Sequence, residues 1–170
     1  MTNLPSDIRA GPLRFARFVI GLWALLGGAV LCAVVLINVY STAASALFGR
    51  PFPGDFEMTE VGIAVAVFAF LPYCQITGAN VTADIFTARA SARTVAILQF
   101  AASIVALGFA TLLVWRMWAG MLDQKAYGYT TAILQFPHWI AFLPILTSLI
   151  LLAIASFITA GEAWRSAHPV

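Results

Sequence analysis

Residues 18–40 read FVIGLWALLGGAVLCAVVLINVY and contain no charged side chain. At a rise of about 1.5 Å per residue, a helix of this length crosses the roughly 30 Å hydrocarbon core of a bilayer. Three further stretches also lack Asp, Glu, Lys and Arg: residues 61–83, 94–115 and 126–161. We therefore predict an all-α integral membrane protein whose single domain, residues 1–170, has four transmembrane helices, near 18–40, 61–83, 94–117 and 138–162.

The composition supports this fold class and excludes several others. Of the 170 residues, 62% are hydrophobic and only 9% are charged, whereas soluble domains carry about 25% charged residues. Such a chain cannot cover its surface with polar groups, so a soluble enzyme is excluded. Two cysteines are too few for a disulfide scaffold, and a net charge of +2 does not indicate a nucleic-acid partner.

The distribution of Lys and Arg predicts the orientation in the membrane. With four spans, both termini lie on the same side. That side carries six of the nine cations, Arg9, Arg14, Arg17, Arg89, Arg93 and Arg165, and the other carries Arg50, Arg116 and Lys125. Cytoplasmic loops are enriched in Lys and Arg, so we expect both termini in the cytoplasm.

The first apolar stretch has a second interpretation, as a secretory signal peptide. Three arginines precede it, and Ala44-Ser45-Ala46 has the small-x-small form of a cleavage site. The apolar region of a signal peptide is about 7–15 residues long, which is shorter than residues 18–40. We therefore expect the stretch to be retained as a membrane helix.

The predicted spans lack the side chains that active membrane proteins use. No Asp, Glu, Lys, Arg or His lies in the middle of any of them, although proton-coupled carriers need an intramembrane ionisable group. The two histidines, His138 and His168, stand outside the span centres, and Cys32 and Cys74 are isolated. We expect no catalytic residue, no cofactor and no metal site, and hence no enzyme.

The second predicted helix ends in a polar segment, residues 72–84, PYCQITGANVTAD. At helical spacing, Tyr73, Thr77, Asn80 and Asp84 share one face, and Gln75 lies on roughly the opposite face. Polar side chains lose hydration in lipid, so both faces are expected to contact protein or water. Alternatively, the segment simply approaches the cytoplasmic surface, where Asp84 is solvated.

The segment before this helix, residues 50–60, contains three acidic residues. Glu57 and Glu60 stand where a helix begins, and negative charge stabilises a helix N-terminus by roughly 0.3–1 kcal/mol. Capping is one role for these carboxylates, and contact with an external protein is the other. The candidates for such a contact are Arg50, Asp55, Glu57 and Lys125.

Two segments carry a resemblance to a known family. Glu57 and Glu60 lead into a helix that ends in QITGANVTADIF at residues 75–86, and TTAILQFPHW at residues 130–139 leads into the last helix. In these features the chain resembles the small membrane subunit of tripartite ATP-independent periplasmic (TRAP) transporters, the DctQ-like family. The resemblance extends over approximately residues 15–165.

The resemblance implies a small scaffold subunit in a bacterial inner membrane. It implies sodium-coupled import of an organic anion, a carboxylate-type solute, that a periplasmic binding protein delivers to a large multi-span membrane subunit. The small subunit stabilises the large one. Tyr73, Gln75, Thr77, Asn80 and Asp84 are the candidate interface with the large subunit, and Arg50, Asp55, Glu57 and Lys125 are the candidate periplasmic contact.

Two other classes of protein remain open at the level of sequence. A stand-alone homodimeric exporter needs a membrane carboxylate, for which Asp84 is the candidate. A membrane anchor of a redox complex needs haem ligands, which the two histidines hardly supply. The sequence does not identify the transported substrate, because the binding protein and the large subunit select it.

Overall fold

The computed structural model describes residues 7–79 and 92–167, which form four helices: α1 (Asp7–Phe48), α2 (Asp55–Thr77), α4 (Ala92–Ala126) and α5 (His138–Ala167). Each helix is long and apolar enough to cross a membrane. The described residues contain no strand beyond an isolated bridge between Thr130 and Pro137. The predicted all-α membrane fold with four spans is therefore confirmed.

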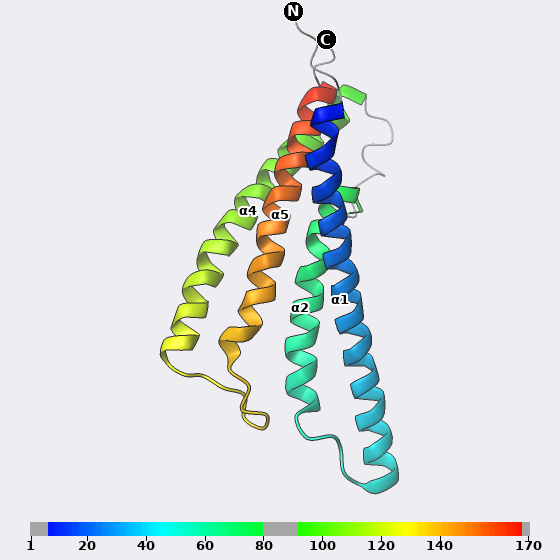
Figure 1. The fold of residues 1–170 in the computed structure, drawn as a ribbon, viewed down its shortest axis with the longest axis vertical. Helices are drawn as coiled ribbons and strands as arrows, with labels where there is room; N and C mark the ends of the chain where they lie inside the picture. Colours follow the sequence, from blue (N-terminus) through cyan, green and yellow to red (C-terminus); the bar gives the residue numbers. More distant parts are fainter. Residues whose placement is uncertain (1–6, 80–91, 168–170) are drawn as a thin grey trace, which may run out of the picture.

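The helices stand side by side in the order α4, α5, α2, α1 (Figure 1). Among the described residues, α4 packs mainly on α5, and α2 packs on both α5 and α1. Contacts between α1 and α5 are few, and they include the hydrogen bond from Trp23 Nε1 to Ser148 Oγ, 2.9 Å. The molecule is thus an open row of helices rather than a closed four-helix bundle.

The beginning of α1 and the end of α5 lie at the same end of the row. Arg17 Nη2 and Glu162 Oε1 form an ion pair of 2.6 Å between these two helix ends, with both side chains about half exposed. The loops after α1 and before α5 lie at the opposite end (Figure 1). The beginning of α1 and the end of α5 therefore lie on the same side of the row (Figure 1).

The helix boundaries differ from the predicted ones, most of all in α2. This helix begins at Asp55 instead of 61 and ends at Thr77 instead of 83. Gly78 follows with a left-handed backbone, φ 67°, and Ala79 N–H and Gly78 N–H donate to the carbonyls of Cys74 and Gln75. This Schellman motif terminates the helix, since glycine adopts positive φ without steric cost.

The other helices extend beyond the charge-free stretches. Helix α1 begins before its charge-free stretch, at Asp7, whereas α4 continues to Ala126 and α5 to Ala167. A stretch without charged residues indicates which part of a helix can lie in the hydrocarbon core of the membrane. Outside the hydrocarbon the backbone can remain helical, because water and lipid headgroups solvate its polar side chains.

Small residues let α1 and α2 approach closely. A Cβ atom built on Gly27 would lie 2.6 Å from the Ala69 Cβ, and one built on Gly62 would lie 2.3 Å from Val34 Cγ2. Both distances are far below van der Waals contact. Without a hydrophobic driving force between helices in lipid, such close packing is a main source of attraction.

Helix α5 is the best-buried element of the row. Leu149, Ala155 and Ser156 are fully buried, and a third of its most apolar stretch is buried, more than in any other spanning helix. Pro144 lies inside this helix, and Ser148 Oγ donates to the Pro144 carbonyl over 2.8 Å while it accepts from Trp23. The serine thereby links the proline-containing turn of α5 to α1.

We predict that Gly27→Ala destabilises the protein by about 1–3 kcal/mol, because the added methyl group pushes α1 away from Ala69. Gly21→Ala in the same helix is the matched control, since nothing lies within 4 Å of its Cβ position. The control should be neutral or stabilising by at most about 1 kcal/mol. Denaturation in mild detergent measures both values, and equal stability of the two variants would contradict the packing described here.

Candidate interaction surfaces

The acidic start of α2 holds the loop between α4 and α5. The carboxylate of Glu57 accepts hydrogen bonds from the backbone N–H of Ile133, 2.7 Å, and of Leu134, 3.0 Å. The loop is also tied internally: Thr131 N–H donates to the Phe136 carbonyl, and Phe136 N–H donates to Thr131 Oγ1, both at 3.0 Å. The role of Glu57 in the described structure is thus to connect two distant parts of the chain.

A glycine permits this connection. Gly54, the N-cap of α2, has φ 80° and is buried. A Cβ atom at this position would lie 2.6 Å from Leu134 Cγ. The leucine side chain therefore occupies the space that any other residue would need, and the left-handed backbone independently favours glycine.

Asp55 is also engaged within the chain. Its carboxylate accepts a hydrogen bond from Ser41 Oγ of α1 and one of 2.7 Å from Phe56 N–H. The same serine hydroxyl accepts from Phe52 N–H at 3.1 Å. Beside it, Asn38 Nδ2 donates to Thr59 Oγ1 over 2.7 Å. Polar side chains thus join α1 and α2 at this end of the row.

The two predicted contact residues that are cationic differ in their surroundings. Lys125, at the end of α4, lies with its Nζ 5.2 Å from the centre of the Trp139 ring, a distance at which a cation is attracted by the aromatic face. Arg50 is exposed in the loop after α1. Of the four predicted candidates for the periplasmic contact, Asp55 and Glu57 therefore have internal partners, and Lys125 has an aromatic neighbour.

The polar end of α2 divides between an exposed and an internal part. Tyr73 is 45% exposed, and Thr77 is exposed with its hydroxyl donating to the Tyr73 carbonyl. Gln75 instead points into the row, where its Nε2 donates to Thr159 Oγ1 of α5 over 3.0 Å. Of the described candidates for the large-subunit interface, Tyr73 and Thr77 are therefore accessible and Gln75 serves helix packing.

Asn80 and Asp84 lie outside the described residues. Among the described residues, α2 ends at Thr77, and Gly78 turns the backbone there. The expected shared face is therefore described only for Tyr73 and Thr77, which lie one turn apart in this helix. Proline, glycine and polar residues are also typical of the end of a helix, so this segment predicted a helix end as well as a polar helix face.

A polar cluster that sequence reasoning missed joins three helices. Thr159 Oγ1 of α5 accepts from Gln75 of α2, lies 3.1 Å from Ser103 Oγ of α4, and donates to the Ser156 carbonyl at 3.1 Å. Hydroxyl and amide side chains are common links between membrane helices. In the sequence, Ser103 and Thr159 are hydroxyl residues in otherwise apolar stretches, which could have indicated a polar contact. Whether they pair depends on which helices become neighbours.

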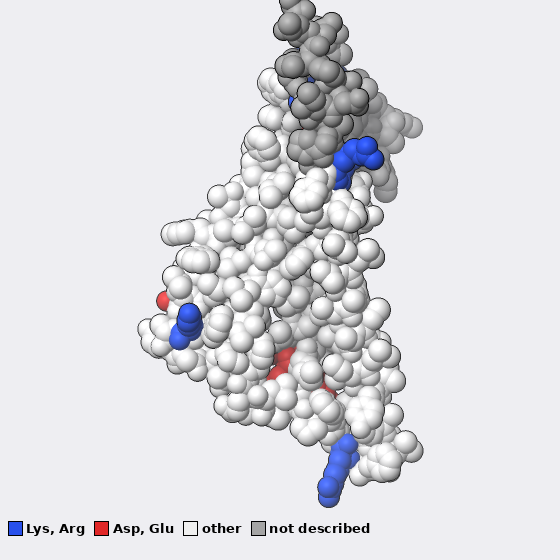
Figure 2. Space-filling model, in the orientation of Figure 1, with Lys and Arg blue, Asp and Glu red and all other residues white. Residues whose placement is uncertain are grey.

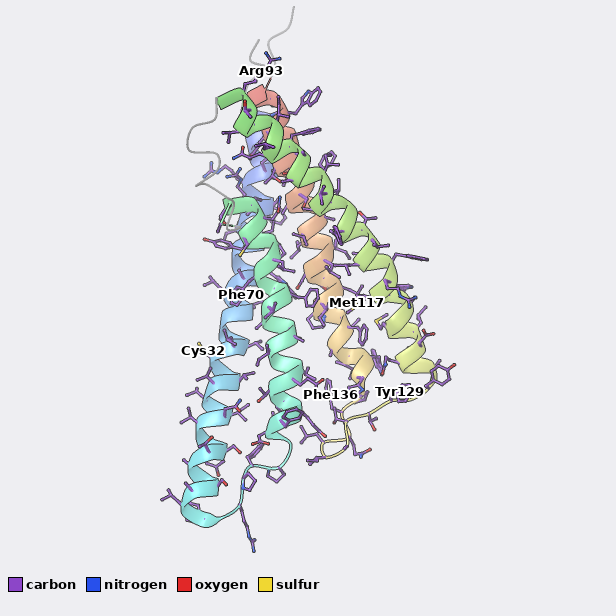
Figure 3. All side chains as sticks on the ribbon, turned by 180° about the vertical axis from the view of Figure 1, so that it is seen from behind. Cys32, Phe70, Arg93, Met117, Tyr129 and Phe136 are labelled. Atoms are coloured by element: carbon purple, nitrogen blue, oxygen red, sulfur yellow. The ribbon has the colours of Figure 1, made fainter. Side chains whose placement is uncertain are left out.

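An apolar hollow lies between α1, α2 and the loop before α5. Its volume is about 560 Å³, and its lining includes Val30, Val34, Val61, Leu134 and Phe136. Phe136 projects from the loop beside the beginning of α2 (Figure 3). Glu57, the charged residue in the lining, is engaged with the loop backbone, so the hollow suits apolar groups.

Within residues 7–79 and 92–167, no cluster of three or more His, Cys, Asp or Glu residues could hold a metal ion.

On the face that Figure 2 shows, the coloured Lys, Arg, Asp and Glu side chains lie towards the top and in the lower part, and a band without charge lies between them. This band has the form expected of a surface that faces hydrocarbon.

Comparison with known proteins gave one family. The family model of the tripartite ATP-independent periplasmic transporters, DctQ component, matches residues 31–166, which include the C-terminal part of α1 and nearly all of the rest of the described chain. This match confirms the resemblance found in the sequence. No match was found among curated proteins or among solved structures.

We predict that Glu57→Gln loosens the loop between α4 and α5, because one of the two acceptor oxygens is replaced by an amide donor that faces a backbone N–H. Hydrogen exchange at the amides of Ile133 and Leu134 should become faster. Glu60→Gln, in an exposed position one turn further along the same helix, is the control and should leave their exchange unchanged. Unchanged exchange in Glu57→Gln would show that the carboxylate does not hold the loop.

We also predict that Thr159→Val destabilises the packing of α2 and α4 on α5. The substitution removes the shared partner of Gln75 and Ser103, and hydrogen bonds between membrane helices contribute about 0.6 kcal/mol on average, with a maximum of about 1.7. Thr147→Val in the same helix is the control, because its exposed hydroxyl donates only to the Leu143 carbonyl within its own helix. Denaturation in detergent should rank Thr159→Val clearly below Thr147→Val, and the reverse order would contradict this role.

Proposed function

Because the chain belongs to the DctQ component family of the tripartite ATP-independent periplasmic transporters, we propose that it is the small scaffold subunit of a sodium-coupled importer. In this proposal the transported solute is an organic anion of carboxylate type. A periplasmic binding protein delivers it, and a large multi-span membrane subunit carries it across a bacterial inner membrane. Both termini of the small subunit lie in the cytoplasm.

The open row of helices is the observation that carries the scaffold role. In the most apolar stretch of each spanning helix, the buried share is 33% for α5, 22% for α1, 17% for α2 and only 11% for α4. Helices in lipid are held together mainly by packing and polar contacts. A row with so little internal packing leaves wide helix faces for a second membrane protein to cover.

The charge distribution supports a static role for the chain. No ionisable residue stands in the middle of the sequence stretches predicted to span the membrane. Carriers place ionisable or broken-helix sites near the bilayer midplane, where they bind solute and coupling ion. In this proposal such sites belong to the large subunit, and the small subunit stabilises the protein around them.

The interface with the large subunit is proposed to include the end of α2. Tyr73 and Thr77 are accessible there, and Asn80 and Asp84 follow in the sequence beyond the described helix. Tyr73 offers a large ring with a polar tip, which suits a partly buried contact. Gln75 holds this end of α2 against α5 through its hydrogen bond to Thr159.

Co-purification and transport together test this proposal. The chain, expressed with the large membrane subunit of its transport system, should purify with it in mild detergent. Uptake in proteoliposomes should need both subunits, the binding protein and an inward sodium gradient. A chain that purifies alone while the large subunit transports without it would overturn the scaffold role.

Substitution of Tyr73 is the sharper form of the same test. Tyr73→Ala removes the exposed ring and should lower the amount of co-purified large subunit several-fold, whereas Tyr73→Phe retains the ring and should preserve most of it. The amount of the small subunit in the membrane serves as the reference. Equal recovery with both variants would remove Tyr73 from the interface.

A further inference from the structure

The end of the row at which α4 begins and α5 ends carries two cations that have no acidic partner among the described residues. Arg93, at the start of α4, and Arg165, in the last turn of α5, are both exposed, and neither guanidinium forms an ion pair within the described part of the chain. Of the acidic residues whose side chains the structure describes, Glu162 is the one at this end, and Arg17 is paired with it. Figure 3 shows Arg93 where α4 begins, close to the end of α5.

An aromatic contact joins the two helices beside these cations. The rings of Phe100 in α4 and Trp164 in α5 have centroids 5.2 Å apart. Arg93 precedes Phe100 by two helical turns and therefore shares its face of α4, about 10 Å nearer to the helix end. Arg165 directly follows Trp164. The ring contact thus holds the two arginine-bearing helix ends next to each other, and we call these four residues the basic aromatic surface.

Exposed apolar side chains continue this surface along both helices. On α4, Ile97 and Ile104 lie on the face of Arg93 and are 51% and 47% exposed. On α5, Phe157 precedes Trp164 by two turns on the same face, and the two side chains are 71% and 53% exposed. A strip of apolar side chains therefore runs from the two cations towards the middle of the spanning helices.

This combination matches the two parts of an anionic phospholipid. A guanidinium presents a rigid fork of N–H donors that fits the oxygens of a phosphate group. Tryptophan prefers the headgroup level of a membrane, and the apolar strip beyond it offers a surface for acyl chains. Basic pockets between membrane helices on the cytoplasmic side bind the head groups of anionic lipids, and the count of Lys and Arg predicts that this end is the cytoplasmic one.

From these observations we infer that the basic aromatic surface binds one anionic phospholipid. Its phosphate lies between Arg93 and Arg165, and its acyl chains lie along the apolar strip. Lipid phosphates are present at this level all around the protein, whereas a protein partner would have to supply carboxylates at the same depth. Such binding needs only this chain and a membrane, and it is therefore independent of the proposed transport function.

The test measures lipid binding to the purified chain in mild detergent by native mass spectrometry. Dioleoyl phosphatidylglycerol should bind at least tenfold more tightly than dioleoyl phosphatidylcholine, and Arg93→Gln with Arg165→Gln should raise its Kd at least tenfold. The matched control, Arg14→Gln with Arg116→Gln, removes the same charge from two other exposed positions and should change the Kd less than twofold. Equal effects of the two double variants would overturn the inference, because net charge and not this surface would then attract the lipid.

Two further measurements identify the occupant of the surface. Glycerol phosphate, which carries the phosphate without acyl chains, should not displace the lipid at equal concentration. The lipid should also remain bound after the chain has assembled with the large membrane subunit. Displacement by glycerol phosphate would leave only a phosphate site, and displacement by the large subunit would make that subunit the occupant. Either result would overturn the inference, while co-purification of the two subunits would still support the scaffold role.

A fluorescence measurement locates the bound lipid. One equivalent of phosphatidylglycerol with brominated acyl chains should quench the tryptophan emission of the wild-type chain. It should quench far less in Trp164→Phe, which keeps an aromatic ring against Phe100. Trp118→Phe, at an exposed position towards the other end of α4, is the control and should leave the quenching unchanged. Quenching that depends on Trp118 instead of Trp164 would place the lipid elsewhere and contradict the assignment.

Discussion

The hydrocarbon core of the bilayer is the constraint on which the rest of this structure depends. About 30 Å of a medium without water requires every backbone polar group in it to be bonded within the segment, and the four described helices meet this requirement. Because lipid tails are as apolar as the side chains, hydrophobic burial does not drive the helices together. Their arrangement depends instead on close contacts such as Gly27 with Ala69 and on a few polar links.

These polar links lie at both ends of the row and between them. Arg17 with Glu162 joins α1 to α5 at one end, Thr159 joins three helices within the row, and Glu57 joins α2 to the loop before α5 at the other end. The small number of links agrees with a protein that completes its packing on a larger partner. Two acidic residues that seemed available to an external protein, Asp55 and Glu57, form such links within the chain.

The structure leaves long helix faces with little burial inside the chain itself. In the proposed scaffold role, a second membrane protein packs against these faces. The chain would then stabilise its partner without carrying the solute itself.

The sequence by itself determined the number of spans, the fold class and the family, because charge-free length and a few short motifs are local properties of the chain. It placed the ends of the helices less well: α2 ends at Thr77 because Gly78 adopts a left-handed backbone, and α1 continues to Phe48, beyond the predicted end near residue 40. Only the tertiary structure decided which polar residues are available to partners. Gln75, Asp55 and Glu57 looked like contact residues, and each bonds to a group at least 14 positions away in the chain. Such pairings depend on which helices become neighbours, and in a medium that solvates all apolar faces alike, the pattern of apolar residues does not specify those neighbours.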